Sequence, residues 1–495
     1  MTAAHDLHMS DRSYTAFPLT TFLIVSAALF MVTLDNLVVT TALPSIRVDL
    51  GAGIDALEWT VNAYTLAYAV LLLTGAALGD RFGRRRMFSL GVALFTLASA
   101  LAALAPSAGA LVAARGLQGV GAAIVTPLTL TLLSEAVPAG RRGLAIGLWS
   151  GISGLGVALG PVVGGAIIDG ISWHWIFWIN VPLGLVLIPV AARRLTESHG
   201  PGRHLDLRGV GLAAGGLLAL VFAIVRANAL GWTSPVVIAG IAGGIALLGL
   251  FLTWEHRAAE PMLPLQFFAS RTFSATSVVS FAMFFGVFGS IFFLSQYFQT
   301  VQGYSPLESG LRTLPWTGMP MFVAPVAGLL SDRIGSRPLM AAGLALQAIA
   351  VGWIAAVATV DTAYMSLVPA FVLGGSGMGL VFAPSANAVL SSVRPQDAGK
   401  ASGATNTIRE LGGVLGIAVL ASAFTSAGGY ASPQDYVDGM TAALPIGVAV
   451  LALGAGAALL VPGRGQGASA IAAAVAAAGG PEGARAAPAA GTLAA

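Results

Sequence analysis

Residues 19–43 read LTTFLIVSAALFMVTLDNLVVTTAL, an apolar run with a single charged residue, Asp35. A helix of this length can cross the hydrocarbon core of a bilayer, which takes about 20 apolar residues. The run is too long for the core of a signal peptide, and residues 1–18 before it lack the basic start that such a peptide needs. The sequence therefore predicts an uncleaved first transmembrane helix that carries an acid inside it.

The composition of the whole chain agrees with this prediction. Of the 495 residues, 56% are hydrophobic and only 9% are charged, whereas soluble proteins carry about 25% charged residues. The chain has no cysteine, which excludes a disulfide framework and a cysteine-ligated metal site. A soluble enzyme and a nucleic-acid-binding domain are excluded as well, and we expect no cofactor, no metal and no nucleic-acid partner.

Fourteen apolar runs are long enough to span a membrane. In lipid each backbone polar group must be satisfied within its own segment, and these runs do not alternate as barrel strands do, so we predict helices. The expected fold class is an all-α integral membrane protein with 14 transmembrane helices. The runs fall at 19–43, 57–79, 87–105, 109–133, 143–168, 174–192, 209–226, 233–254, 272–298, 309–330, 338–358, 363–391, 403–427 and 440–461.

The basic residues indicate how these helices are oriented. With the N-terminus inside, 20 of the 24 basic residues fall in cytoplasmic segments. Arg47, Arg226 and Arg312 fall in outer loops, and Arg115 lies inside a span. Because cytoplasmic loops carry an excess of Lys and Arg, we predict a multi-pass protein of the cell membrane with both termini cytoplasmic. Residues 1–18 and the Ala/Gly/Pro-rich residues 462–495 would be cytoplasmic tails, the second one disordered.

A short pattern, D-R-x-G-x-R, occurs twice. Residues 79–86 read GDRFGRRR between the second and third runs, and residues 331–337 read SDRIGSR between the tenth and eleventh. If two extra helices separate two halves of six helices each, both copies follow the second helix of their half and lie on the same side of the membrane. Many transporters are built from such repeated halves, with the substrate site at their interface. We therefore predict six-helix halves at 19–195 and 271–461, with two additional helices within 205–256.

Four motifs carry a resemblance to a known family. They are LDNLVVTTALP at 34–44, the loop at Asp80, RGLQGVG at 115–121 and GVALGPVVGG at 156–165. With them, the chain resembles the major facilitator superfamily, and within it the fourteen-span drug:proton antiporters of the EmrB/QacA type. The run WHWIFWINVP at 173–182 is similar to that branch too. Leu37, Thr40 and His174 depart from the usual Thr, Asn and Arg. The resemblance implies the major facilitator fold, and its fourth motif implies export.

Asp35 and Arg115 are the candidate proton-coupling pair. A charged acid inside a bilayer is costly, so an intramembrane acid is expected to exchange protons. Arg115 lies at nearly the same depth in the membrane as Asp35, to within about 5 Å. The two side chains can pair if their helices are neighbours. The alternatives are an acid hydrogen-bonded near the surface and an arginine that snorkels to the interface. Glu410, beside Arg409, is either a second proton or cation site or an ion-paired helix start.

The two copies of the repeated loop offer a second kind of site. An Asp at a helix end beside several arginines forms charge-assisted hydrogen bonds. Such a network would hold the two halves together as a conformational latch on the cytoplasmic side. The alternative is simple anchoring by positive charge. The residues that match the family's latch are Asp80, Arg81, Gly83, Arg84, Asp332 and Arg333.

Small residues in the fifth run share one helix face, because Gly156, Gly160 and Gly164 are spaced four apart. Such a stripe lets another helix approach closely, and Pro161 adds a kink. The stripe is open to two interpretations. It either serves packing alone or, together with Pro161 and Gly165, forms the exporter motif.

Aromatic and polar side chains within the spans are candidates for a substrate cavity. In the ninth run, phenylalanines recur at helical spacing at 281, 284, 288 and 292. They form either an apolar wall for a lipophilic cation or a stripe that faces lipid. The candidates for the cavity are Asn62, Tyr64, Gln118, Phe288, Gln296, Asn387 and Asn406.

The sequence therefore predicts a secondary transporter that expels small amphipathic drugs or antibiotics in exchange for protons by alternating access. Its partners would be protons, the lipid bilayer and a small lipophilic substrate. We expect the substrate to be a cation, because the ionisable side chains within reach of the cavity include acids. We also expect a monomer. A phosphate-binding loop and an H-E-x-x-H motif are absent from the sequence. We therefore expect neither an ATP-driven pump nor an enzyme of any other kind. The alternatives are a proton-coupled importer of a small metabolite on the same fold, a channel, and a non-transporting receptor or lipid translocase.

Overall fold

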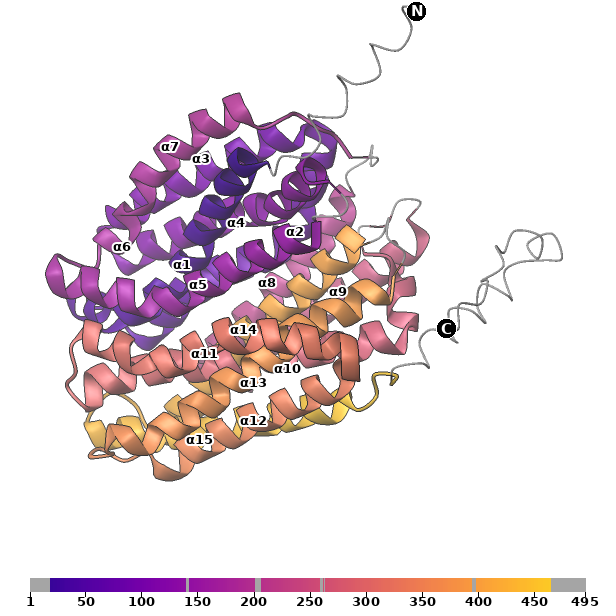
Figure 1. The fold of residues 1–495 in the computed structure, drawn as a ribbon. Helices are drawn as coiled ribbons and strands as arrows, with labels where there is room; N and C mark the ends of the chain where they lie inside the picture. The colour runs from indigo at the N-terminus through magenta and orange to yellow at the C-terminus, as the bar shows by residue number, and fades with distance from the viewer. Residues whose placement is uncertain are drawn as a thin grey trace, which may run out of the picture.

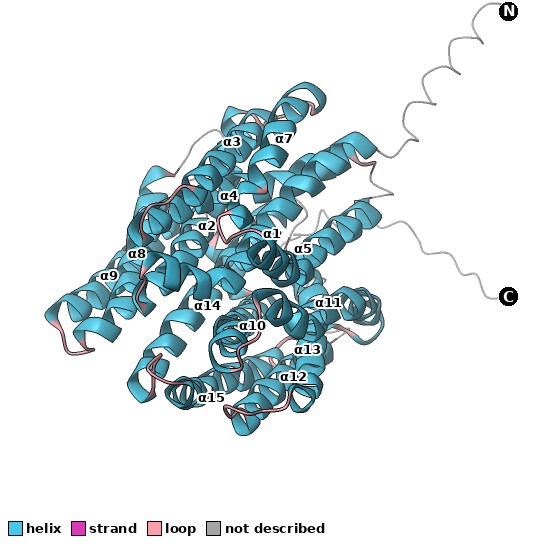
Figure 2. Cartoon of the chain, turned by 90° about the vertical axis from the view of Figure 1, so that its left-hand side faces the viewer, coloured by secondary structure: helices cyan, strands magenta, loops and turns pink. Residues whose placement is uncertain are grey.

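The computed structural model describes residues 18–138, 142–200, 206–258, 261, 263–393 and 398–463. Within these ranges every regular element is a helix, as Figure 2 shows. The elements are α1 (Leu19–Leu50), α2 (Ile54–Phe82), α3 (Arg84–Ala103), α4 (Ala108–Ala136), α5 (Arg142–Gly170), α6 (Trp175–Trp178), α7 (Asn180–Arg194), α8 (Leu207–Leu230), α9 (Pro235–Arg257), η2 (Leu265–Ala269), α10 (Arg271–Gln296), η3 (Tyr297–Val301), α11 (Pro306–Ile334), α12 (Ser336–Val357), α13 (Tyr364–Ser391), α14 (Ala398–Ala427) and α15 (Pro433–Ala458).

The described helices account for the predicted number of spans. Thirteen are long and apolar enough to cross a membrane, with α6 and α7 together making one of them and η3 extending another. The fourteenth is α2, whose parts Ile54–Leu72 and Thr74–Phe82 meet at 51°. The prediction of an all-helical membrane protein is thus confirmed, with thirteen candidate spans among the described residues, or fourteen when the bent α2 counts as one. Most of residues 1–18 and of the tail 462–495 lie outside the described residues.

Helix α1 is longer than predicted. It continues through Pro44 to Leu50, although the expected span ends at Leu43. A proline inside a helix removes one backbone hydrogen bond, and this helix tolerates that loss without ending. The left-handed Gly51, with φ at 59°, ends the helix instead. Asp35 therefore lies near the middle of α1 and not in its last turns.

The helices form two groups, which Figure 1 shows as an indigo-to-magenta half and an orange-to-yellow half. Helices α1–α7 make the N-terminal half, in which α2 packs on α4 and α3 packs on α4 and α7. Helices α10–α15 make the C-terminal half, in which α11 and α12 both pack on α13. Helices α8 and α9 pack on each other, and α8 also contacts α2 of one half and α14 of the other.

The two halves meet mainly toward one end of the bundle, which we call the Leu50 end after the last residue of α1; the opposite end is the Leu19 end. At the Leu50 end, Ser295 Oγ donates to the Thr40 carbonyl oxygen and Gln299 Nε2 donates to that of Thr41, at 3.3 and 3.0 Å. Ser305 Oγ donates to Asp169 at 2.7 Å. The largest cluster of buried apolar residues also spans both halves here. Toward the Leu19 end, each half has an apolar cluster of its own.

A cation and two polar side chains add to the contacts at the Leu50 end. The Arg47 guanidinium of α1 lies 4.0 Å from the ring centre of Tyr430, in the loop between α14 and α15. Burial raises the pKa of the Tyr430 hydroxyl well above its ordinary value, so this group stays protonated. It donates to Gln296 Oε1 at 2.5 Å. These contacts join the two halves, so the Leu50 end is closed.

Candidate functional site

The carboxylate of Asp35 is enclosed in the N-terminal half. Asp35 is 1% exposed and accepts hydrogen bonds on both of its oxygens. Arg115 Nη1 of α4 donates to Oδ2 at 2.5 Å. Gln118 Nε2 of α4 and Asn180 Nδ2 of α7 both donate to Oδ1 at 2.8 Å. A buried charge is tolerated only when it is paired and hydrogen-bonded, and this one is both.

Arg115 is held by several contacts, although its buried Nη2 has no hydrogen-bond partner among the described residues. It is fully buried, and its Nε donates to the carbonyl oxygen of Thr60 at 3.1 Å. Its guanidinium lies 4.2 Å from the centre of the Tyr64 ring, within the range of a cation–π interaction. The alternatives of a snorkelling arginine and of an acid near the surface are therefore wrong, because both groups are buried and in direct contact.

Two members of this network were not predicted. Asn180 lies at the start of α7, and its amide donates to Asp35 and weakly to Ser99 Oγ, at 3.4 Å. Ser99, on α3, accepts from Gln118 Nε2 at 2.8 Å. The available signal was an amide inside an apolar span, in the run WHWIFWINVP. The sequence does not show which face of the helix the amide occupies, so the group that it contacts could not be predicted.

The second acid lies in the C-terminal half and is less well satisfied. Glu410 is 4% exposed and lies twelve residues from the start of α14. Its Oε1 is 3.8 Å from Arg409 Nη2, whereas its buried Oε2 has no hydrogen-bond partner among the described residues. The alternative of an ion-paired helix start is wrong, because α14 begins well before it. Arg409, assigned to a cytoplasmic segment, likewise lies inside the helix.

Phenylalanines surround the Arg409 side chain. Its guanidinium lies 4.8 Å from the ring centre of Phe284 on α10 and 5.5 Å from that of Phe382 on α13. Phe284 in turn stacks on Phe288, with 4.9 Å between the ring centres. Phe284 and Phe292 are buried and Phe281 and Phe288 half-buried, so the alternative of a stripe facing lipid is wrong. Helix α10 lies inside the protein and not at its periphery.

Two tyrosines on α2 lie between the acids. Tyr64, under the Arg115 guanidinium, stacks on Tyr68 with 6.1 Å between the ring centres. Tyr68 is close enough to Glu410 and Arg409 to interact with them electrostatically. Contacts between side chains therefore run from Asp35 through Arg115 and Tyr64 to Tyr68, and Tyr68 lies within electrostatic range of Glu410.

The other predicted cavity residues lie in different surroundings. Asn62 is fully buried, and neither atom of its amide has a hydrogen-bond partner among the described residues. Gln118 belongs to the Asp35 network, and Gln296 is bonded to Tyr430 at the Leu50 end. Asn387 is exposed, and Asn406 is half-buried. The structure thus does not bring the predicted set together in one place.

The small-residue stripe of α5 lies between α1 and the C-terminal half. A Cβ added at Gly160 or Gly164 would fall 2.9 or 2.6 Å from side-chain atoms of α1, and Gly156 faces Thr33. Gly165 faces α11 instead, where an added Cβ would lie 2.4 Å from a carbonyl oxygen. A Cβ added at Gly310 of α11 would likewise collide with the Pro161 carbonyl oxygen. The stripe therefore packs α5 on α1, and Gly165 and Pro161 bring the same helix against α11 of the other half.

The repeated loops share their backbone geometry. Gly83 has φ at 101° and Gly335 has φ at 86°, so each copy of the pattern turns at its glycine in a conformation that other residues rarely adopt. Each glycine lies between two helices, α2 and α3 in one case and α11 and α12 in the other. In the second copy Arg333 is exposed, and the Asp332 side chain lies outside what the structure describes.

The first copy of the loop forms a network inside one half. Arg84 donates to Asp80 at 2.9 and 2.7 Å and also pairs with Glu135 of α4. The Gly200 amide donates to the Asp80 carbonyl oxygen at 3.0 Å, and Arg81 lies exposed over the Phe82 ring. The described contacts join α2, α3, α4 and the segment after α7. The contacts described for this copy stay within the N-terminal half, and the latch between the two halves stays a prediction.

Sequence comparison places the chain among transport proteins. The profile of the Major Facilitator Superfamily matches residues 25–207 and 202–417. The chain is 36% identical over 423 residues to the tetracenomycin C resistance and export protein of Streptomyces glaucescens, covering 85% of this chain and 78% of that protein. It is 37% identical over 468 residues to the cephamycin export protein CmcT of Amycolatopsis lactamdurans, covering 92% and 94%.

Solved structures have the same fold. A bacterial homologue of the human lysosomal transporter Spinster, inward-facing and unoccupied, matches with a TM-score of 0.64 at 17% identity, covering 90% of this chain and 97% of that one. A D-xylose–proton symporter matches with a TM-score of 0.62 at 15% identity, covering 90% and 98%. At these identities the likeness concerns the fold alone.

Proposed function

The chain belongs to the major facilitator superfamily, and from this premise we propose that it is a proton-coupled exporter of small amphipathic drugs or antibiotics. The observation that carries the proposal is the fully buried Asp35–Arg115 pair, whose ionised form is expensive to keep inside a membrane helix bundle. Relatives that cover most of this chain are named as export and resistance proteins, which supports drug efflux as the direction and substrate class.

The orientation we propose places both termini, and with them the Leu19 end, in the cytoplasm. The distribution of basic residues supports it. The Leu50 end would then face outside. Because the hydrogen bonds between the halves gather at that end, the structure would correspond in this orientation to a state closed to the outside. In this state the substrate would reach the space between the halves from the cytoplasm or the inner leaflet.

Protonation of Asp35 would change how α1 is held. The ionised carboxylate accepts three hydrogen bonds, two from α4 and one from α7. A proton on Oδ2 removes the charge that binds Arg115, and the bond that joins α1 to α4 weakens. Helix α1 also packs on the glycine stripe of α5, which contacts α11 of the other half. A proton at Asp35 can therefore bias the arrangement of the two halves.

Glu410 is our candidate for the contact with the substrate. Its Oε2 has no hydrogen-bond partner among the described residues, and its Oε1 lies 3.8 Å from Arg409, whose guanidinium packs against the Phe284 and Phe382 rings. Aromatic faces and a carboxylate together favour a lipophilic cation. The tyrosines between Glu410 and Asp35 would let a bound cation and a bound proton influence each other. We propose a monomer as the transporting unit.

Transport in inverted membrane vesicles tests this proposal. We would impose a pH gradient, acid inside, and follow the uptake of a fluorescent lipophilic cation by the intact protein and by Asp35→Asn. Asp49→Asn is the matched control, since Asp49 lies on the same helix with a half-exposed side chain. We expect gradient-driven uptake in the intact protein and the control, and its loss in Asp35→Asn.

The other outcomes distinguish the alternatives. Full uptake in Asp35→Asn would contradict the role of Asp35 and move the coupling to Glu410. Movement of substrate out of the inverted vesicles, with the protons, would indicate a proton-coupled importer. Uptake that does not depend on the pH gradient would contradict proton coupling itself.

A further inference from the structure

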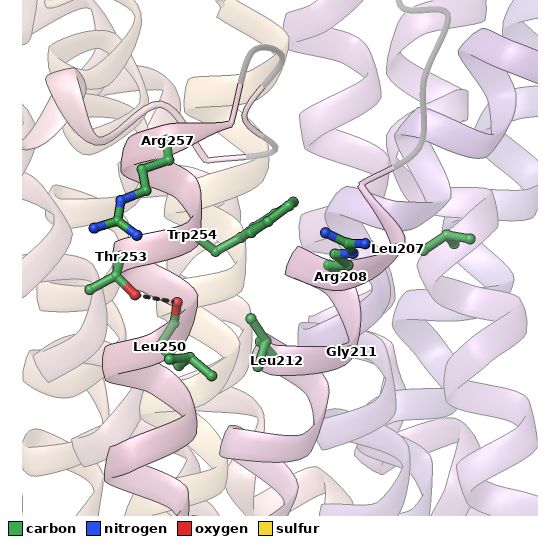
Figure 3. A pocket seen from close by; sticks show the side chains of 8 residues that line it. All are labelled: Leu207, Arg208, Gly211, Leu212, Leu250, Thr253, Trp254 and Arg257. Carbon is green, nitrogen blue, oxygen red and sulfur yellow. Dashed lines mark hydrogen bonds between the residues drawn. The ribbon is translucent and has the colours of Figure 1, made fainter.

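A groove opens between the two additional helices, away from the Asp35 and Glu410 sites. It has a volume of about 590 Å³ and lies where α8 begins and α9 ends. Figure 3 shows Arg208 on α8 and Arg257 on α9 at the end of the helix pair, with the Trp254 indole between them. Leu212 and Leu250 lie farther along the same two helices. The groove therefore has a cationic end and an apolar interior.

The packing of α8 and α9 explains why the groove is there. Farther along the pair, Gly216 and Gly244 let the helices touch, and an added Cβ at either would lie 2.9 Å from the partner helix. At Gly211 an added Cβ would meet nothing within 4 Å. Near the Leu19 end the helices touch again, since an added Cβ at Gly209 would lie 2.8 Å from Glu255 of α9. The groove lies on the Gly211 face of the pair, and the leucines that line it are exposed, with Leu207 at 70% and Leu250 at 57%. In a membrane these side chains face lipid.

The cationic end is built from side chains with fixed positions. Trp254 Nε1 donates to both carboxylate oxygens of Asp206, at 2.8 and 2.9 Å, which orients the indole. The Arg208 guanidinium lies 5.1 Å from the centre of that ring. No described carboxylate forms an ion pair with Arg208 or Arg257. The lining of the groove thus holds two arginines and no carboxylate, while the Asp206 carboxylate lies beside the lining on Trp254. Figure 3 shows the Arg257 guanidinium turned away from that of Arg208.

A second groove, also at the Leu19 end of the molecule, is lined by arginines whose charges are paired with an acid. It has a volume of about 350 Å³ and is lined by Arg85 and Arg86 of α3. There Glu197 lies 3.6 Å from the Arg85 guanidinium and 3.7 Å from that of Arg86. The protein supplies its own anion at that groove. At the α8–α9 groove the nearby Asp206 carboxylate is bonded to Trp254, and no described carboxylate lies within ion-pair distance of Arg208 or Arg257.

We propose that the α8–α9 groove binds one anionic phospholipid of the cytoplasmic leaflet. Its phosphate would lie between Arg208 and Arg257, and an acyl chain would lie along Leu212 and Leu250. A tryptophan and two arginines at the same level are typical of the headgroup region, and basic pockets between membrane helices on this side bind anionic headgroups. The proposal uses the orientation given above but is independent of the transport reaction.

Native mass spectrometry of the full-length protein tests this proposal. The protein would be released from nanodiscs containing equal amounts of phosphatidylglycerol and phosphatidylcholine of the same acyl chains, and the retained lipids counted. We expect one phosphatidylglycerol to be retained in preference to phosphatidylcholine. Because each basic residue near a membrane surface contributes about 1 kcal/mol, Arg208→Gln with Arg257→Gln should lower that preference roughly 10- to 30-fold.

Three further variants separate the lipid site from a general loss of charge or fold. Arg208→Lys with Arg257→Lys keeps both charges and should keep most of the preference. Gly211→Phe should fill the open space and reduce lipid retention while both arginines remain. Arg85→Gln with Arg86→Gln removes two cations from the neutralised groove and should leave the preference unchanged. Unchanged thermal unfolding of each variant would show that it is folded.

Three results would overturn the proposal. The first is equal retention of the two lipids by the intact protein. The second is an unchanged preference in the double glutamine variant. The third is displacement of the lipid by millimolar glycerol 3-phosphate, which would show a site for a free phosphate and not for a phospholipid. Failure of proton-driven transport would leave lipid retention unaffected, so the two proposals can fail separately.

Discussion

Asp35 and Glu410 are both buried beside an arginine, one in each half, but they differ in how their charges are satisfied. Asp35 accepts three hydrogen bonds of 2.8 Å or less from two neighbouring helices. Glu410 has only Arg409, its neighbour in the chain, at 3.8 Å, and one of its oxygens has no hydrogen-bond partner among the described residues. The N-terminal half thus holds its acid within a hydrogen-bond network, whereas the acid of the C-terminal half can still accept a hydrogen bond.

This difference suggests a division of labour. A carboxylate whose bonds come from other helices changes the packing of those helices when it gains a proton, so Asp35 suits conformational coupling. A carboxylate with a free oxygen can accept a new partner without first losing an old one, so Glu410 suits a cationic ligand. Breaking a buried pair by removing one member leaves an uncompensated charge, which is the expensive event. The two acids should therefore respond very differently to the same change.

The largest expected effect follows from removing the arginine in each half. Arg115→Met leaves Asp35 buried without its cation, and we expect a loss of about 3–5 kcal/mol in the free energy of unfolding. Arg409→Met also leaves a buried acid without its cation, but the contact that it removes is 3.8 Å long and not hydrogen-bonded, so we expect a smaller loss of about 1–3 kcal/mol. Thermal or denaturant unfolding in one detergent would measure both.

A double variant tells whether the cost at Arg115 comes from the stranded charge. Asp35→Asn combined with Arg115→Met removes both charges and should recover much of the stability that Arg115→Met loses. Equal losses at Arg115 and Arg409, or no recovery in the double variant, would contradict the comparison between the two acids.

Two buried asparagines in the N-terminal half give a smaller effect with a matched control. Asn180→Ala removes a donor to the Asp35 carboxylate, and a hydrogen bond to a charged group contributes about 1.5–3 kcal/mol. Asn62→Ala removes an equally buried amide that has no described partner, so it should be neutral or slightly stabilising. Unfolding measurements on both variants check the difference. A loss at Asn62 as large as that at Asn180 would show that an unseen partner satisfies Asn62.

The role of Glu410 predicts a selective change in transport. Glu410→Gln should weaken the apparent affinity for a lipophilic cation roughly tenfold, equivalent to about 1.4 kcal/mol, and should leave a neutral substrate of similar size unaffected. Stability should not fall, because the unpartnered oxygen leaves little to lose. Concentration series of both substrates in inverted vesicles measure the effect. An equal loss for both substrates would assign Glu410 to coupling instead.

The fold was predictable from the sequence because a bilayer restricts the possible structures so strongly. Apolar run lengths gave fourteen spans, and the D-R-x-G-x-R pattern gave two repeats whose glycines, Gly83 and Gly335, indeed share a positive φ. Helix ends were less predictable. Pro44 does not end α1, and α14 begins at Ala398, several residues before the apolar run at 403. Lipid exposure fixes where a helix must be apolar, but not where its hydrogen bonding stops.

The site was predictable only in part. A single acid and a single arginine inside apolar runs identified Asp35 and Arg115, because buried charges are costly enough to require each other. The partners Asn180 and Ser99 could not be identified, since polar neutral side chains in a membrane helix are common and one sequence does not fix helix faces. The same uncertainty led Gln118 to be assigned to the cavity and the α10 phenylalanines to be assigned either to the cavity or to lipid.

The smallest expected effect concerns Ser99, at the edge of the Asp35 network. Its hydroxyl does not touch the carboxylate, but it accepts from Gln118 at 2.8 Å and donates to the Phe95 carbonyl oxygen at 2.9 Å. Ser99→Ala leaves the Gln118 amide with its bond to Asp35 intact, so we expect a loss of about 0.5–1.5 kcal/mol in unfolding and little change in gradient-driven uptake. A matched control is Thr96→Val, one turn away on α3, whose hydroxyl bonds only within its own helix. If Ser99→Ala lowered uptake as much as Asn180→Ala, the network would extend to α3 as a functional unit. Proton coupling would then depend on three helices around α1.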